Sequence, residues 1–360
     1  MEEDTTYKLG DISTMKYGKL PPKHINEGNY PIWSGYRYVG KCNEFNCNKG
    51  DIIIVARGVG GTGDVKIAKE DCYLTNLSIQ VKLDKNICQP EYFYYSYLLS
   101  NLKYLDSGSA QSQITIEDLK RLEVTLPPLE QQHKITDILK SIDEKIELNR
   151  QINDNLEQQA SSLLSDWIST YPCRTYKLSD ICKYANAKCE TGNLIPQNYI
   201  STENMLPNKK GIVEASNIPT GKATCYKVDD VLIANIRPYF QKIWKADING
   251  GCSADVLCIR ANIESHSPIL YWLLHQDAFF EYVMTGAKGC KMPRGDKQHI
   301  MNWSIDLPEV QYWADLATQL GSIDQQIAYN RIESINLSNL RDTLLPKLMS
   351  GELEINEIDC

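Results

Sequence analysis

The chain carries the stretch Leu126-Pro127-Pro128-Leu129-Glu130-Gln131-Gln132, followed by Ser141-Ile142-Asp143-Glu144-Lys145-Ile146. It later carries a related stretch, Leu307-Pro308-Glu309-Val310-Gln311, followed by Ser322-Ile323-Asp324-Gln325-Gln326-Ile327. The two align without a gap at an offset of 181 residues, which is about half of the 360-residue chain. An internal repeat of this period predicts that both halves share one order of elements.

Behind each opening proline, apolar residues recur at alternating spacings of four and three. In the first copy this stripe contains Ile135, Leu139, Ile142, Ile146, Asn149, Asn153, Leu156, Ala160, Leu163 and Trp167. In the second copy it contains Leu316, Leu320, Ile323, Ile327, Asn330, Ser334, Leu337, Arg341, Leu344 and Leu348. Such a heptad seam predicts a long helix that packs one narrow face against a helical partner.

The polar residues Asn149 and Asn330 fall at the same place in the two seams. A polar seam residue costs stability but fixes register and partner choice, so matching polar breaks favour pairing of the two helices with each other. Pro127 and Pro308 lie just ahead of the helices, where a missing N–H does no harm. Gly351 lies where the second helix should end.

Composition excludes several classes of protein. No run of eighteen apolar residues is present, so we expect no membrane span. The N-terminal residues 1–6 are acidic and polar, unlike a signal peptide. The twelve cysteines form no C-x-x-C pair and no His lies at ligand spacing from a cysteine pair, which predicts reduced thiols and no zinc site. These features predict a cytoplasmic protein.

The net charge of −8 is unevenly distributed. Residues 1–126 carry a net charge of −1 and residues 171–307 carry +3, whereas residues 127–170 carry −4 and residues 308–360 carry −6. The negative charge therefore belongs to the expected helices. This pattern permits polyanion binding by the segments between the helices and a protein partner for the helices themselves.

In the first half, the buried strand expected at Ile52–Val55 leads to a glycine-rich run from Gly58 to Gly63. The run fits G-x-G-x-x-G, but a dinucleotide site needs a helix next, and residues 64–68 alternate like a strand. We therefore interpret it as a hairpin turn whose backbone could approach a DNA phosphate. Tyr92–Leu99 predicts a core helix rather than a base-stacking platform.

A polar loop, Ser107–Gln113, precedes a helix start at Thr115-Ile116-Glu117-Asp118. Gln111 and Gln113 carry amides that suit adenine edges, although an ordinary surface loop is an equal alternative.

The second half repeats these features. Strands are predicted near Gly211-Ile212-Val213 and at Val231–Ala234, and a core helix at Pro268–Leu274. Asn235-Ile236-Arg237-Pro238-Tyr239 superficially resembles an amino-methyltransferase motif. Its second proline is missing and no glycine loop for S-adenosylmethionine precedes it, so we reject that chemistry for this chain.

The most basic short stretch is the loop from Gly286 to Gln298, which takes the place of Ser107–Gln113. Its four cations are Lys288, Lys291, Arg294 and Lys297. Cations among glycines suit phosphate and guanine contacts, whereas the simpler alternative is a solvated loop.

The chain resembles the specificity subunits of type I restriction–modification systems over nearly all of its length. The Leu126–Gln132 box and its helix look like that family's central conserved region, and residues 308–351 look like its distal repeat. The Gly286–Gln298 loop is similar to those of target-recognition domains. In the second copy, Pro308-Glu309-Val310-Gln311-Tyr312-Trp313 departs from the family's usual P-P-L-E-Q-Q type of sequence.

The resemblance implies an α+β fold with two similar mixed α/β target-recognition domains, separated by two long helices that form an antiparallel, pseudo-twofold symmetric coiled coil. The expected parts are a first recognition domain at residues 1–126, a central helical spacer at 127–170, a second recognition domain at 171–307 and a distal spacer at 308–360. Two similar modules on a spacer suit the two halves of a bipartite DNA site.

The resemblance also implies a DNA-recognition subunit without catalysis of its own. Its expected partners are double-stranded DNA, two methylation subunits that carry S-adenosylmethionine and methylate adenine, and an ATP-dependent restriction subunit; no membrane partner and no cofactor of this chain are expected. The predicted DNA-binding residues are Arg37, Lys41, Arg57, Gln111, Gln113, Arg237, Lys288, Lys291, Arg294, Lys297 and Gln298.

Three alternatives remain from the sequence. The partner could be a fused nuclease–methylase of a type II system, and the neighbouring gene would distinguish this case. The chain could instead be an enzyme that holds a nucleotide at Gly58–Gly63, which stoichiometric binding of ATP, NAD or S-adenosylmethionine would reveal. It could also be a coiled-coil adaptor with protein partners alone, which predicts no DNA binding.

Overall fold

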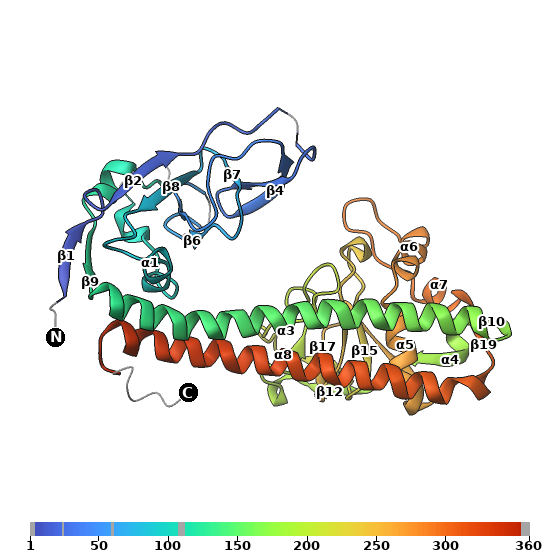
Figure 1. Ribbon diagram of the computed structural model, residues 1–360. Coiled ribbons are helices and arrows are strands. Elements are labelled where there is room, and N and C mark those ends of the chain that lie inside the picture. The colour runs from blue at the N-terminus through green and yellow to red at the C-terminus, as the bar shows by residue number, and fades with distance from the viewer. Residues whose placement is uncertain (1–3, 24, 59–60, 107–111, 354–360) are drawn as a thin grey trace. The chain divides into compact units, whose positions relative to one another are not determined.

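The computed structural model describes residues 4–23, 25–58, 61–106 and 112–353 (Figure 1). The chain divides into two compact units. Unit 1 combines residues 1–147 with residues 334–360, and unit 2 comprises residues 148–333. Each unit therefore contains one mixed α/β domain and one half of each long helix.

The two predicted long helices are present. Helix α3 runs from Leu129 to Thr170 and helix α8 from Trp313 to Met349, after a short 3-10 turn, η5 (Val310–Tyr312). Gly351 follows α8 with a φ of +71°, a left-handed conformation that glycine adopts without strain, so the helix ends where the sequence predicted. Most seam residues near the helix ends are buried, including Leu139 and Leu320.

Unit 1 is built on an antiparallel four-stranded sheet of order β2-β8-β5-β6. Its strands are β2 (Ser13–Tyr17), β8 (Ser78–Leu83), β5 (Ile52–Val55) and β6 (Val65–Ile67). The β-branched residues of β5 are all buried, as the sequence predicted. Because β5 and β6 pair directly, the glycine run between them is the connection of a hairpin, which confirms the structural interpretation made from the sequence.

The remaining elements of unit 1 surround this sheet. They are β1 (Thr5–Lys8) paired with β9 (Glu123–Leu126), the β4-β3-β7 sheet of Arg37–Cys42, Tyr30–Ser34 and Tyr73–Leu74, the turn η1 (Lys103–Leu105), and helices α1 (Pro90–Ser96) and α2 (Ile116–Lys120). Tyr92, Phe93 and Tyr95 of α1 are buried, so this aromatic helix belongs to the core. Thr115 and Asp118 form a capping box at α2, at the predicted helix start.

Unit 2 repeats the four-stranded sheet in the order β11-β18-β15-β16. Its strands are β11 (Cys182–Tyr184), β18 (Val256–Ala261), β15 (Val231–Ala234) and β16 (Ile243–Lys245). A second sheet has the order β12-β14-β17-β13, formed by Lys188–Glu190, Lys222–Tyr226, Gly250–Cys252 and Tyr199–Ile200. The pair β10 (Cys173–Lys177) and β19 (Ser304–Pro308) corresponds to β1 and β9.

Helices complete unit 2. They are α4 (Leu178–Ile181), α5 (Ser267–Leu274), α6 (Asp277–Thr285) and α7 (Lys297–Met301), with 3-10 turns η2 (Thr191–Asn193), η3 (Pro238–Phe240) and η4 (Glu264–His266). Trp272 and Leu273 of α5 join a single core with Leu164 of α3 and Leu316 of α8. The domain and its helix halves therefore share one hydrophobic core rather than packing as separate bodies.

The strand predicted near Gly211-Ile212-Val213 is wrong. Only an isolated bridge between Met205 and Ile212 is present. Gly211 has a φ of +81°, and the Asn204 side chain donates to the Val213 carbonyl at 2.9 Å. A short loop closed by an amide side chain satisfies these backbone groups locally and leaves no extended segment to join a sheet.

In unit 2 the polar break of the seam forms one hydrogen-bonded cluster. The Asn149 amide donates to Glu333 Oε2 at 2.7 Å and contacts the Asn330 carbonyl at 3.4 Å. The Asn330 amide in turn donates to Asn153 Oδ1 at 2.8 Å. The prediction that the matching breaks meet each other is thus confirmed, and the two helix halves of this unit run antiparallel.

An aspartate of the repeated Ser-Ile-Asp sequence anchors the domain to the helix in each unit. In unit 1, Asp143 accepts from the Tyr95 hydroxyl at 2.8 Å and pairs with Arg341 of α8 at 2.7 Å. In unit 2, Asp324 accepts from Trp272 Nε1 at 2.8 Å and pairs with Lys245 of β16 at 2.6 Å. The two aspartates are 181 positions apart, so the repeat preserves the anchor while its donors change.

The unit 2 anchor predicts a specific loss of stability. Asp324 and Lys245 are both largely buried, and burial raises the pKa of Asp324 while Lys245 acts in the opposite direction. Asp324→Ala removes an acceptor from the Lys245 ammonium and from the Trp272 N–H. Because Asp229 still pairs with Lys245 at 3.1 Å, we expect a loss of about 2 kcal/mol in the free energy of unfolding. Urea denaturation followed by tryptophan fluorescence measures it.

Two controls test the cause. Gln325→Ala alters the exposed neighbouring residue and should change stability little. Asp324→Ala combined with Lys245→Met should cost less than the sum of the single changes, because the pair is then removed together. Additive losses would contradict a direct interaction.

Candidate nucleic-acid interface

In each unit, the end of a central strand meets the end of a loop. In unit 1 the carbonyl of Ala56, just after β5, accepts from Ile114 N–H at 3.0 Å, and Arg57 forms a bridge with Gln113. A strand end that is fixed by backbone hydrogen bonds places its exposed side chains reproducibly.

The same junction recurs in unit 2. The carbonyl of Asn235, just after β15, accepts from Gly295 N–H at 3.1 Å, and Ile236 forms a bridge with Arg294. Gln113 and Arg294 are 181 positions apart, so the two loops end at equivalent places. Helices α2 and α7 follow directly, capped by Thr115 and Asp296.

The basic loop of unit 2 is a short hairpin. Lys288 and Arg294 exchange two backbone hydrogen bonds of 2.9 Å, and Gly289 adopts a φ of +100° in the turn between them. The side chains of Lys288, Lys291 and Arg294 are exposed. The hairpin thereby holds three cations on one projecting segment.

Two carboxylates orient these cations. Lys288 pairs with Asp296 at 2.6 Å, and Arg294 pairs with Asp255 at 3.1 Å. The Lys288 hydrogen bond, together with the backbone N–H groups of His299 and Gln298, lowers the pKa of Asp296 to about 2. Because these ion pairs are exposed, each contributes little stability, and both cations can exchange a carboxylate for a phosphate at small cost.

Lys297 and Gln298 lie in the first turn of α7. The Lys297 ammonium is 5.6 Å from the centre of the Tyr184 ring, and the Tyr184 hydroxyl donates to the Lys297 carbonyl at 3.1 Å. Gln298 is exposed, and its backbone N–H donates to Asp296 at 2.9 Å. Both residues therefore continue the surface that Lys288 and Arg294 begin.

Arg237 has an unusual environment beside this loop. The backbone N–H of Arg237 donates to the Pro293 carbonyl at 2.7 Å, and the backbone φ of Arg237 is +52°. A left-handed conformation costs a residue other than glycine about 1 kcal/mol or more. Its Nε is shielded from solvent and has no hydrogen-bond partner within the part of the chain that the structure describes. Gly58, which follows Arg57, occupies the related place in unit 1 with a φ of +148°.

In unit 1, Arg37 lies at the tip of the β3–β4 hairpin. Its Nε donates to the Tyr36 hydroxyl at 3.0 Å. The Tyr36 ring covers the glycine loop, because a Cβ added at Gly61 would lie 2.8 Å from Tyr36 Cδ1. Gly35 of the same tip lies against the Arg57 carbonyl, so Arg37, Arg57 and Gln113 belong to one region of the unit.

Two of the predicted DNA-binding residues, Lys41 and Gln111, are not placed at the strand-end junction by the structure. Lys41 is exposed on β4 opposite Pro31, four residues from Arg37, which places it about 13 Å away along an extended strand. Among the described residues, no hydrogen bond or ion pair links the Lys41 side chain to the strand-end junction. Gln111 lies outside the described residues.

Sequence reasoning missed the residues that position the cations. The Asp255 and Asp296 carboxylates orient Arg294 and Lys288, and Tyr36 covers the glycine loop. Asp296 could have been found as a helix-capping residue ahead of α7. Asp255 and Tyr36 carry no local signal, since their roles depend on contacts between distant segments.

Two structural features are absent among the described residues. Over the part of the chain that is described, no cluster of three or more His, Cys, Asp or Glu side chains is arranged to hold a metal ion. Within that same part, no helix combines the length and apolarity needed to span a bilayer. The described cysteines are free thiols.

Part of the chain matches a family model, and full-length relatives resemble nearly all of it. Residues 1–158 match the type I restriction modification DNA specificity domain. The type I restriction enzyme MjaIX specificity subunit of Methanocaldococcus jannaschii is 24% identical, covering 98% of this chain and 94% of that protein. The MjaVIII specificity subunit of the same organism is 21% identical, covering 99% and 95%.

A solved structure extends this likeness to the fold. The crystal structure of the type I restriction–modification S subunit from M. genitalium superposes with a TM-score of 0.60 at 19% identity, covering 96% of both chains. The matched domain, the full-length relatives and the shared fold agree with the duplicated order of domain and helix. The chain is thus similar to type I restriction enzyme specificity subunits along nearly its whole length, and its first 158 residues match their DNA specificity domain.

Proposed function

We propose that the chain is the DNA-specificity subunit of a type I restriction–modification complex. Its two recognition domains read the two halves of a bipartite site, and its helices dock the methylation subunits. The observation that carries this proposal is the repeated junction of strand end and loop end, which presents cationic and amide side chains from equivalent places in both units.

The exposed side chains of the basic loop and of α7 in unit 2 fall into two chemical groups. Lys288 and Lys291 end in ammonium groups, which suit phosphate oxygens and position a protein on the duplex. Arg294 and Gln298 carry forked donors or an amide, which suit the edges of guanine and adenine in the major groove. Lys297 and Arg237 complete this surface as further phosphate contacts.

Unit 1 presents a different set. Arg37 and Arg57 supply its cations, and Gln113, with Gln111 of the same loop, supplies amides for adenine edges. Lys41 serves at most the phosphates at the margin of this set. Because the two junctions are equivalent but carry different side chains, the two half-sites differ in sequence.

The proposed parts of the chain follow the sequence division. Recognition domains at 1–126 and 171–307 contact DNA, and the spacers at 127–170 and 308–360 bind protein partners. The two spacers together carry a net charge of −10, whereas the two recognition domains together carry +2, and this distribution disfavours DNA contact by the spacers and suits a protein interface.

In this proposal the partner subunits carry out the catalysis. Two methylation subunits supply S-adenosylmethionine and transfer the methyl group to adenine, and a restriction subunit supplies ATP-driven cleavage. The present chain acts without catalysis, in the cytoplasm, by choosing the DNA sequence.

Arg294 provides a direct test of sequence reading. Arg294→Ala removes the forked donor of the loop, so the complex should accept other bases at one position of one half-site. A bidentate contact discriminates bases by about 1–3 kcal/mol, which corresponds to a loss of roughly 5- to 150-fold in preference. Genome-wide mapping of methylated adenine in cells carrying the variant measures it.

A matched variant controls for charge. Lys222 is an exposed cation on β14, near Glu190, and Lys222→Ala should leave the methylated sequence unchanged. An unchanged methylated sequence with Arg294→Ala, in cells that lose this methylation when the gene is deleted, would remove Arg294 from base recognition.

The lysines should behave differently from Arg294. Lys288→Ala and Lys291→Ala should weaken binding evenly across DNA sequences and reduce the dependence of log affinity on log salt by about 1 each. Binding of the assembled complex to specific and unrelated duplexes at several salt concentrations measures this. A selective loss on the specific duplex alone would instead assign the lysine to base reading.

A further inference from the structure

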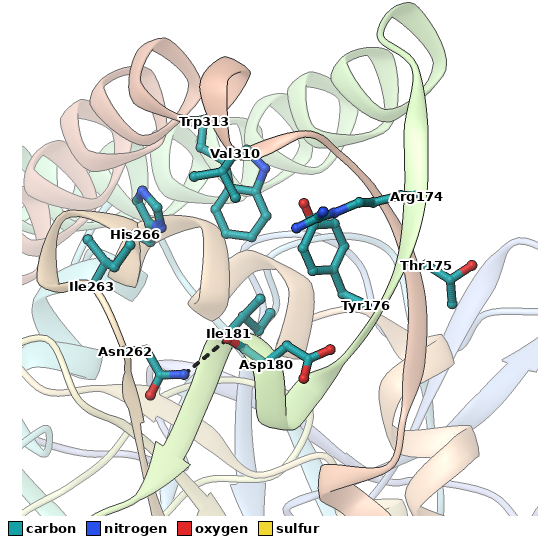
Figure 2. Close-up of a pocket in the computed structure, with 10 residues that line it drawn as sticks. All are labelled: Arg174, Thr175, Tyr176, Asp180, Ile181, Asn262, Ile263, His266, Val310 and Trp313. Atoms are coloured by element: carbon teal, nitrogen blue, oxygen red, sulfur yellow. Dashed lines mark hydrogen bonds between the residues drawn. The ribbon is translucent and has the colours of Figure 1, made fainter.

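A pocket of about 300 Å³ lies in unit 2 where β10, the segment before α5 and the start of α8 come together. Figure 2 shows its walls, with Trp313 at the start of α8 and Val310 of η5 on one side and Arg174 and Tyr176 of β10 on the other. His266 lies against Trp313, with ring centres 4.9 Å apart. This volume is large enough for a side chain or a short segment of a ligand.

The pocket contains a buried hydroxyl without a hydrogen bond. Tyr176 is 5% exposed, and its hydroxyl has no partner among the described residues. Figure 2 shows the hydroxyl directed toward the α8 end, beside the Arg174 side chain. A buried donor that the protein itself leaves unsatisfied is costly, and a bound acceptor would remove that cost.

Arg174 supplies a positive charge at the same place. Its guanidinium lies 4.4 Å from the centre of the Tyr176 ring, and no carboxylate of the described chain pairs with it. The nearby Asp180 is already engaged, since its Oδ2 accepts from Lys177 N–H at 2.8 Å. Asp180 lines the pocket together with Arg174, but no ion pair joins the two among the described residues, so the Arg174 guanidinium remains available to pair with an acidic group of a ligand.

The rest of the pocket is apolar. The Trp313 ring is buried, whereas Val310 and Ile263 at its edge are 44% and 52% exposed. Burial lowers the pKa of His266, so its imidazole is neutral near pH 7 and adds no second charge. The Arg174 guanidinium and the Tyr176 hydroxyl, together with the apolar Trp313 ring, therefore suit a ligand that carries one carboxylate on an otherwise apolar group.

The residue equivalent to Trp313 makes different contacts in unit 1. Gln132, 181 positions before Trp313, donates to the carbonyls of Pro127 at 2.8 Å and Ile87 at 3.0 Å, and accepts from Gln89 N–H at 2.9 Å. Trp313 keeps only the first of these contacts, donating to Pro308 at 2.7 Å. The Gln132 amide thus makes three hydrogen bonds in unit 1, whereas its counterpart Trp313 in unit 2 makes one and contributes an aromatic ring to the pocket.

We propose that the Arg174–Tyr176–Trp313 pocket binds an acidic side chain, flanked by apolar residues, from the methylation subunit. The proposal rests on the proposed function. The exposed apolar edge at Val310 and Ile263 favours a protein segment over a free small carboxylate, because a chain that continues past the carboxylate covers this edge as well. The unpaired guanidinium gives the charge complementarity that selects Asp or Glu.

The test uses the full chain and its methylation subunit. Arg174→Gln should weaken their association at least 10-fold, and Tyr176→Phe, which removes one hydrogen bond, about 3- to 10-fold. Lys177→Gln removes a neighbouring cation that does not line the pocket and should leave the affinity unchanged. Isothermal titration calorimetry measures the dissociation constants, and thermal melting confirms that each variant is folded.

The acidic residue is identified from the partner. Each exposed Asp or Glu of the methylation subunit is changed to Asn or Gln, and one such change should weaken binding as much as Arg174→Gln and have little further effect when combined with it. Wild-type affinity for both pocket variants, or losses that no partner carboxylate reproduces, would overturn the proposal while leaving the proposed function intact. Failure of the wild-type chain to bind the methylation subunit would overturn both.

Discussion

The carboxylate of the repeated Ser-Ile-Asp sequence is the interaction on which each unit depends. Asp143 and Asp324 each accept a hydrogen bond from an aromatic side chain of the domain, Tyr95 or Trp272, and each carries a salt bridge to a cation. A partly buried carboxylate is stable only with such partners. The helix therefore selects one orientation of its domain, and apolar packing around Leu139 or Leu320 would not do so by itself.

The polar cluster at Asn149, Asn153 and Asn330 has a related role within unit 2. Amides in a seam must find partners, and a shift of one helix along the other would separate them. The apolar stripe supplies most of the attraction between the helix halves, whereas the asparagines fix the register. Specific pairing thus depends on the few polar groups of an otherwise apolar contact.

Local patterns in the sequence predicted much of this fold. The heptads predicted α3 and α8, the glycine run before alternating residues predicted the β5–β6 hairpin, and Thr115 with Asp118 predicted the start of α2. Prediction failed where a side chain outside the apolar pattern decides the backbone, as at Gly211–Val213, where Asn204 closes a short loop. The surroundings of Arg294 and Arg237 could not be predicted either, because Asp255 and Pro293 reach them only through the tertiary fold.

A main-chain hydrogen bond closes the junction in each unit. Ile114 N–H meets the Ala56 carbonyl, and Gly295 N–H meets the Asn235 carbonyl, so neither bond requires a particular side chain at Arg57, Gln113 or Arg294. Mutational drift can therefore replace the exposed residues there while the scaffold keeps its shape. Under the proposed function, such a protein acquires new target sequences by exchanging a few surface groups, without first having to evolve a new framework.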